Sequence, residues 1–154
     1  SRPEVLLDLI GGGPLTRELK AEAFRLGLHS AVVFRGSIHN IVPALLDADL
    51  FVLPSHYEGL SLAYLEALAA GLPVIASDIS ENIEVDPEGA ATLFFKAGYA
   101  HSLAARIQEL AGDKNARLRL AKRAPGIAQR FQIERIGPAF LEALSSAAAG
   151  TWPR

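Results

Sequence analysis

The sequence predicts an α/β fold in which helices cover both faces of a mainly parallel sheet. Short apolar stretches alternate with longer stretches of helical periodicity along the 154 residues. This alternation requires crossover connections, which make successive strands parallel. A stretch as continuously apolar as Phe51, Val52 and Leu53 is typical of a strand buried on both faces. Half of the residues are hydrophobic, which is ample for the core of one domain.

Turn-forming residues and apolar periodicity place the elements in order. Gly27 follows the first helical stretch as a stop, and Gly36 follows the second strand. Pro54 ends the third strand, and Pro73 opens the fourth, where a missing N–H group is tolerated. Strands are expected at 5–10, 31–34, 49–53, 73–77 and 91–95, and helices at 15–26, 41–48, 61–70, 101–111, 115–129 and 133–148. We expect the polar stretch 78–89 to form a loop whose carboxylates are mostly solvated.

Composition excludes several classes of function. The formal net charge is −2 and there is no long basic run, so the footprint of a nucleic-acid-binding protein is absent. There are no cysteines, and the four histidines are scattered without metal-ligand spacing. No apolar run reaches the roughly 20 residues of a transmembrane helix. We therefore expect no nucleic-acid partner, no metal and no transmembrane segment.

A single acidic residue stands out in the helix expected at 61–70. On a 3.6-residue period Glu66 shares a stripe with Leu62, Leu65 and Ala69, which predicts a carboxylate on a buried face. A charge there is costly unless a specific partner holds it. Glu66 is therefore a candidate ligand-binding residue, although a neighbouring backbone group or arginine would also satisfy it.

The segment before this helix suits a phosphorylated, polyhydroxylated ligand. It runs from Ser55 to Leu60 and leads into helical N–H groups that have no internal partner. Those groups and the helix dipole favour a phosphate, which Gly59 allows to approach closely. Glu66 would accept hydrogen bonds from the diol of a ribose, and Glu58 would reach a second sugar beyond the phosphates.

Simpler interpretations of these residues remain open. Glu58 is also explained as a solvated loop carboxylate, His56 as a surface histidine and Ser61 as a helix N-cap. The glycines Gly11–Gly13 are also explained as a tight strand-to-helix turn with Pro14 at the first helical position. That turn nevertheless follows the carboxyl end of a strand, where open α/β sheets bind ligands.

The order of these features resembles a known family. Glu58 and Glu66 are followed by the strand Gly71–Val74, which matches the Glu-x7-Glu and Gly-x-Pro-Val hallmark of GT-B glycosyltransferases of group 1, the GT4 family. Leu9–Pro14, Val32–Gly36 and Val42–Ser55 resemble the preceding strands and turns of that family, so the similarity covers about residues 5–95. Glu-x7-Glu alone is a weak pattern, but with its flanking elements in order it is specific.

The resemblance implies a Rossmann-like three-layer αβα sandwich, the carboxy-terminal half of a GT-B enzyme. It implies a retaining transfer of a sugar from a nucleoside diphosphate sugar, with a UDP-sugar as the favoured donor and no cofactor. Glu58 would be the catalytic residue. The residues expected to bind the donor are Glu66, Gly59, Leu60, Ser61, Leu62, Gly11, Gly12, Gly13, Arg35, Gly36, Ser37, Ile38, Ser55 and His56.

The resemblance also predicts what the chain lacks. We expect residues 1–154 to form a single nucleotide-sugar-binding domain that is truncated at its first strand and helix, with 130–154 as a carboxy-terminal helix and tail. The acceptor would be bound by an absent amino-terminal domain, and the family's Arg and Lys for the diphosphate are absent too. We expect this chain to lack turnover alone and an exposed sheet to favour homodimers. The parent would be cytoplasmic, peripheral at the inner membrane face, and would make polysaccharide or lipopolysaccharide.

Three other functions are compatible with parts of the sequence. A dinucleotide-binding oxidoreductase fits poorly, because Thr16 replaces the third glycine of its fingerprint and Phe34 and Arg35 stand where an acidic residue is needed. A GT-B sugar-nucleotide epimerase or phosphorylase-like enzyme fits the fold but not the spacing of Glu58 and Glu66. A non-catalytic nucleotide-binding domain remains an alternative.

Overall fold

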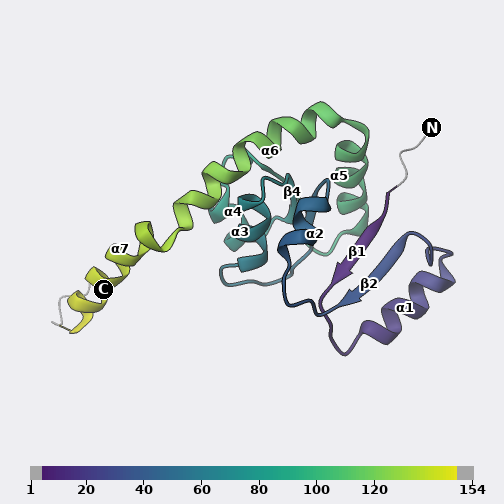
Figure 1. The fold of residues 1–154 in the computed structure, drawn as a ribbon, viewed down its shortest axis with the longest axis horizontal. Helices are drawn as coiled ribbons and strands as arrows, with labels where there is room; N and C mark the ends of the chain where they lie inside the picture. The colour runs from purple at the N-terminus through teal and green to yellow at the C-terminus, as the bar shows by residue number, and fades with distance from the viewer. Residues whose placement is uncertain (1–4, 149–154) are drawn as a thin grey trace. The chain divides into compact units, whose positions relative to one another are not determined.

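The computed structural model describes residues 5–148, and the chain divides after Ala44 into two compact units (Figure 1). Both units contain parallel strands and helices in alternation, so the predicted α/β class is confirmed. The ends of the expected strands and helices are confirmed to within two residues.

Unit 1, residues 1–44, contains a two-stranded parallel sheet and one helix. Strand β1 (Leu7–Ile10) pairs with β2 (Val32–Gly36). Helix α1 (Thr16–Arg25) has Leu26 as its C-cap and is followed by Gly27, whose φ of +70° is a conformation that favours glycine. An exposed ion pair joins the two strands, with Arg35 Nη2 3.1 Å from Asp8 Oδ2. Because both side chains are about half exposed, the pair contributes less than about 1 kcal/mol.

Unit 2, residues 45–154, contains a three-stranded parallel sheet in the order β3–β4–β5. Its strands are β3 (Phe51–Leu53), β4 (Val74–Ser77) and β5 (Thr92–Phe95). Its helices, with α2 at the division between the units, are α2 (Val42–Asp47), α3 (Leu62–Ala69), α4 (Ser80–Val85), α5 (Ala100–Gly112), α6 (Lys114–Ala128), the 3-10 helix η1 (Gln129–Phe131) and α7 (Ile133–Ala148). No helix of the described part of the chain has both the length and the apolar character needed to cross a membrane.

Ladder hydrogen bonds join the described strands into two parallel sheets, one in each unit, whereas the sequence led us to expect one sheet.

The core lies in unit 2. All four residues of β4 are buried, and Ile75 on this strand packs with Phe95 of β5 and Leu110 of α5. Strand β3 is less buried than expected, because it is an edge strand and only Leu53 is fully enclosed. In the described part of unit 1, only Ala23 is buried.

The expectation that 78–89 is a loop is wrong in part, because this stretch contains helix α4. Asn82 and Val85 lie one turn apart on this helix and are both buried. Asp86 is buried as well, whereas Asp78, Glu84 and Glu88 are exposed as expected. The short buried face of α4 therefore forms despite the polar composition of the stretch.

Candidate functional site

The loop from Pro54 to Ser61 connects the carboxyl end of β3 to the start of α3. Within it Glu58 is half-buried, and its Oε1 accepts a hydrogen bond from the Ser55 hydroxyl at 2.6 Å. Glu58 is therefore an oriented carboxylate, which differs from a freely solvated loop residue.

The expectation that Glu66 lies on a buried face is wrong. Helix α3 buries Tyr64, Ala67 and Leu68, whereas Glu66 is exposed and Leu62 is 71% exposed. The reason is that α3 packs against α6 and the sheet, and the face that becomes buried is the one with Tyr64, Ala67 and Leu68. Within the described chain, the Glu66 carboxylate has no hydrogen bond or ion pair, so it is free to accept hydrogen bonds from a ligand.

The first turn of α3 leaves its N–H groups available. Ser61 occupies the N-cap position, but its side chain makes no capping hydrogen bond, so the expected N-cap function is absent. The Leu65 N–H group donates to the Ser61 carbonyl at 3.2 Å. The three preceding N–H groups have no recorded acceptor among the described residues, and with the helix dipole they favour an anion.

A hollow of about 400 Å³ lies beside this loop. Its walls come from the loop, from α4 and from η1, and its lining residues are Tyr57, Glu58, Gly59, Leu60, Glu81, Glu84, Val85 and Phe131. The sequence did not indicate that α4 and Phe131 lie beside this loop. The paired burial of Asn82 and Val85, one helical turn apart, is the signal that identifies α4.

His56 is exposed and lies against the loop that follows β5. A Cβ atom added to Gly98 would lie 3.4 Å from Cε1 of His56, and Gly98 has a φ of +78°. A side chain at residue 98 would therefore make an ordinary contact with His56, and it is the φ angle of Gly98 that favours glycine there. Its contact with a ligand stays a prediction.

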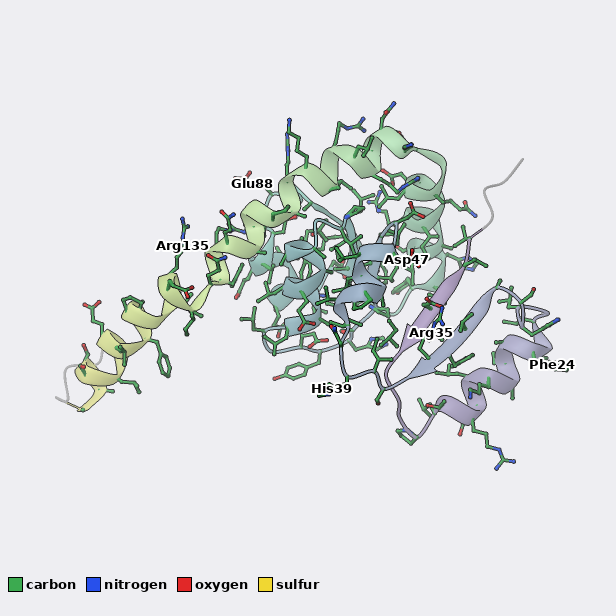
Figure 2. All side chains as sticks on the ribbon, in the orientation of Figure 1. Phe24, Arg35, His39, Asp47, Glu88 and Arg135 are labelled. Carbon is green, nitrogen blue, oxygen red and sulfur yellow. The ribbon has the colours of Figure 1, made fainter. Side chains whose placement is uncertain are left out.

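The structure also brings together the two predicted turns of unit 1. Gly11 donates its N–H group to the Gly36 carbonyl at 2.8 Å, and a Cβ atom on Gly12 would lie 3.7 Å from Oγ of Ser37. Arg35, which Figure 2 labels on β2, differs from these residues because it pairs with Asp8.

In the alternative interpretation of Gly11–Gly13, Pro14 is the first helical residue, but α1 begins at Thr16. The reason is a local hydrogen bond, in which the Thr16 hydroxyl donates to the Gly13 carbonyl at 2.8 Å and closes the turn. Donor binding by this turn stays a prediction.

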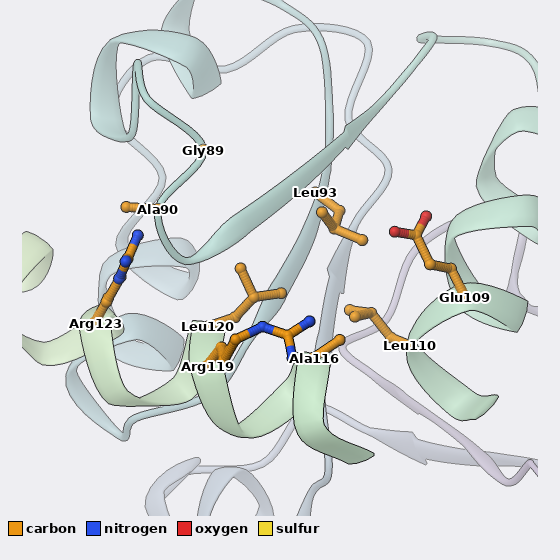
Figure 3. Close-up of a pocket in the computed structure, with 9 residues that line it drawn as sticks. All are labelled: Gly89, Ala90, Leu93, Glu109, Leu110, Ala116, Arg119, Leu120 and Arg123. Carbon is orange, nitrogen blue, oxygen red and sulfur yellow. The ribbon is translucent and has the colours of Figure 1, made fainter. Parts of the chain in front are cut away.

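A second hollow of unit 2, of about 230 Å³, shares no lining residue with the predicted site (Figure 3). Leu93, Leu110 and Leu120 contribute apolar side chains to it, and Arg119 and Arg123 lie along one of its sides. In the described part of the chain, no group of three or more histidine, aspartate or glutamate side chains is arranged to hold a metal ion.

Comparisons with known proteins agree with the arrangement of strands and helices. A family model described as glycosyl transferases group 1 matches residues 1–126. The lipopolysaccharide core biosynthesis glycosyltransferase LpsE of Rhizobium meliloti (strain 1021) is 32% identical over 145 residues, which is 94% of this chain and 43% of LpsE. The sulfoquinovosyl transferase SQD2 of Arabidopsis thaliana is 32% identical over 127 residues, which is 79% of this chain and 24% of SQD2. The chain spans less than half of the length of these relatives.

Solved structures give the same result. HepE from Anabaena, in complex with UDP-glucose, matches with a TM-score of 0.84 and 29% identity over 94% of this chain and 42% of HepE. WaaG, a glycosyltransferase involved in lipopolysaccharide biosynthesis, matches with a TM-score of 0.72 over 80% of this chain and 34% of WaaG. At 23% identity, the second match shows the fold alone.

Proposed function

Because the chain belongs to the group 1 family of glycosyltransferases, we propose that unit 2 binds the nucleoside diphosphate sugar from which the parent enzyme transfers a sugar. The observation that carries this proposal is the pair Glu58 and Glu66 on either side of an uncapped helix start. One carboxylate is oriented in the loop, and the other is exposed and unpaired one turn into α3. The bound UDP-glucose of HepE supports a UDP-sugar as the donor.

Each part of the donor has a matching group. Glu66 accepts hydrogen bonds from the two hydroxyl groups of the ribose. The N–H groups at the start of α3 stabilise the distal phosphate, whose negative charge increases as it leaves. Glu58 faces the sugar and stabilises the positive charge that develops at its anomeric carbon.

The transfer replaces one bond to the anomeric carbon with another. The bond to the diphosphate oxygen breaks, the bond to the acceptor oxygen forms on the same face, and the acceptor proton passes to the leaving phosphate. The acceptor binds outside this chain, and the chain alone binds the donor without turnover. We further propose that the parent assembles lipopolysaccharide or polysaccharide at the cytoplasmic face of the membrane, a setting supported by the names of LpsE and WaaG.

The first test is a calorimetric titration of the chain with UDP, GDP, ADP and NAD. We expect one nucleoside diphosphate to bind and Glu66→Ala to weaken its binding about 100-fold, because hydrogen bonds to a charged group contribute roughly 1.5–3 kcal/mol each. Glu142→Ala is the matched control, since Glu142 is an exposed helical carboxylate of α7. Equal affinities of Glu66→Ala and the unaltered chain would contradict the proposed role of Glu66.

A further inference from the structure

A continuous series of hydrogen bonds runs from the core of unit 2 to Glu58. The Asn82 side-chain amide donates to the carbonyl and to Oγ of Ser77, at 3.0 and 3.1 Å. The Ser77 hydroxyl donates to the Ser55 carbonyl at 2.5 Å, and the Ser55 hydroxyl donates to Oε1 of Glu58 at 2.6 Å. The series thus connects α4, β4 and the loop that carries Glu58.

The inner members of this series are fixed by burial. Ser77 has no exposed surface and Asn82 is 1% exposed. Among the described residues, no buried side-chain nitrogen or oxygen lacks a hydrogen-bond partner. A buried polar group that loses its partner costs about 1–3 kcal/mol, so the series resists rearrangement.

We propose that Ser55, Ser77 and Asn82 are positioning residues that hold the Glu58 carboxylate toward the donor sugar. This inference rests on the proposed function. We call these three residues the Glu58 anchor. None of them contacts the reacting atoms in the proposed arrangement, and each acts through the next.

The physical reason for the Glu58 anchor is the cost of ordering a glutamate side chain. A free glutamate loses up to roughly 1.5–2 kcal/mol of rotamer entropy when a ligand fixes it. The Ser55 hydroxyl fixes one carboxylate oxygen in advance and leaves the other oxygen for the sugar. Because that cost is already met in the folded protein, binding of the sugar does not have to overcome it.

The position of Asn82 explains why an uncharged amide is buried in α4. Its amide donates to two oxygens of Ser77, which fixes the direction of the Ser77 hydroxyl toward the loop. An apolar residue would fill the same space but would leave the Ser77 groups without a donor. The buried amide is therefore explained by orientation of the loop.

The test compares UDP-glucose with UDP as calorimetric probes, because only the first contains the sugar that Glu58 is proposed to contact. We expect Ser55→Ala to weaken binding of UDP-glucose about tenfold and to change binding of UDP less than twofold. Ser55→Thr, which keeps a hydroxyl, should restore the affinity for UDP-glucose. Ser80→Ala is the matched control, since its hydroxyl donates to Glu81 of the same helix.

A second measurement does not need a ligand. NMR couplings should show one Glu58 side-chain rotamer in the unaltered chain and averaged rotamers in Ser55→Ala. Asn82→Ala should have the same effect more weakly. If this variant fails to fold, Ser55→Ala alone decides the result.

The outcomes separate this inference from the proposed function. Equal weakening of UDP and UDP-glucose, or no weakening of either, would overturn the Glu58 anchor. A chain that binds neither probe would contradict the proposed function with a UDP-sugar, and the rotamers would then decide about the anchor. A Glu58 side chain that stays in one rotamer in Ser55→Ala would overturn the anchor whatever the chain binds.

Discussion

Replacing Asp86 with alanine is expected to lower the free energy of unfolding by roughly 2–5 kcal/mol, because two N–H groups lose their acceptor. The two Asp86 carboxylate oxygens accept hydrogen bonds from the N–H groups of Ala90 and Ala91, each at 2.9 Å. Asp86 is 1% exposed and Ala91 has no exposed surface, so water cannot replace the carboxylate without opening the turn between α4 and β5. Urea denaturation followed by circular dichroism measures the loss.

Glu88→Ala is the control for this experiment, because Glu88 is an exposed acidic residue in the same turn. It should change the free energy of unfolding by less than about 0.5 kcal/mol. The loss of unfolding free energy in Asp86→Asn should lie between the losses in Asp86→Ala and Glu88→Ala, since the amide keeps one acceptor oxygen. A loss below 1 kcal/mol in Asp86→Ala would show that the turn is not held by the carboxylate.

Replacing Tyr64 with alanine is expected to lower the free energy of unfolding by roughly 3–5 kcal/mol, as for other large aromatic side chains. Tyr64 is fully buried in the first turn of α3, and its hydroxyl forms a hydrogen bond of 2.5 Å with that of Thr92 on β5. Tyr64→Phe removes only the hydroxyl and should cost about 1–3 kcal/mol, because the buried Thr92 hydroxyl loses its partner. Thermal or urea denaturation of both variants separates packing from hydrogen bonding, and equal losses in the two would contradict this account.

The same side chain makes stability depend on alkaline pH. Burial is the main cause that raises the pKa of Tyr64 above its usual range; the Thr92 hydroxyl lowers the pKa, and the charge of Asp86 raises it further. Above about pH 10 the unfolded chain loses the phenol proton while the folded chain keeps it. The unfolded state then binds fewer protons, so the contribution of Tyr64 is complete below about pH 10 and falls as the pH rises toward the folded pKa. Tyr64→Phe should lose less stability between pH 9 and 11.5 than the unaltered chain, as measured by urea denaturation.

Local patterns in the sequence were sufficient for most of the fold. Apolar runs in the sequence indicated each of the described strands, and Gly27 and Gly36 indicated the ends of α1 and β2. Both glycines have positive φ angles in the structure, which explains why glycine stands there. Helix α4 was not predicted because it is short, and its buried face contains Asn82, a polar residue that hydropathy counts against a core. Its burial depends on Ser77, which lies on a different element and cannot be identified from periodicity.

The candidate site was predicted less completely than the fold. The sequence indicated Glu58 and Glu66 from their spacing, but it placed Glu66 on the wrong face of α3. The reason is that two faces of α3 have similar hydrophobicity in the sequence. One contains Leu62, Glu66 and Ala69 and is exposed, and the other contains Tyr64, Ala67 and Leu68 and is buried. Only tertiary packing decides which of two apolar faces of a helix is buried.

Helix α7 extends from η1 without a single buried residue, and Ile133, Phe140 and Leu141 are each more than 60% exposed (Figure 1). A helix of 16 residues that receives little support from packing is only marginally stable in water, and Pro138 inside it removes one hydrogen bond. The cooperative unit of this chain therefore ends near Phe131, and α7 opens on its own at a much smaller free energy than β4. Hydrogen exchange would measure the opening of α7 and the opening of β4 separately. A melting curve based on helical signal alone would combine the opening of α7 with the unfolding of the rest of unit 2.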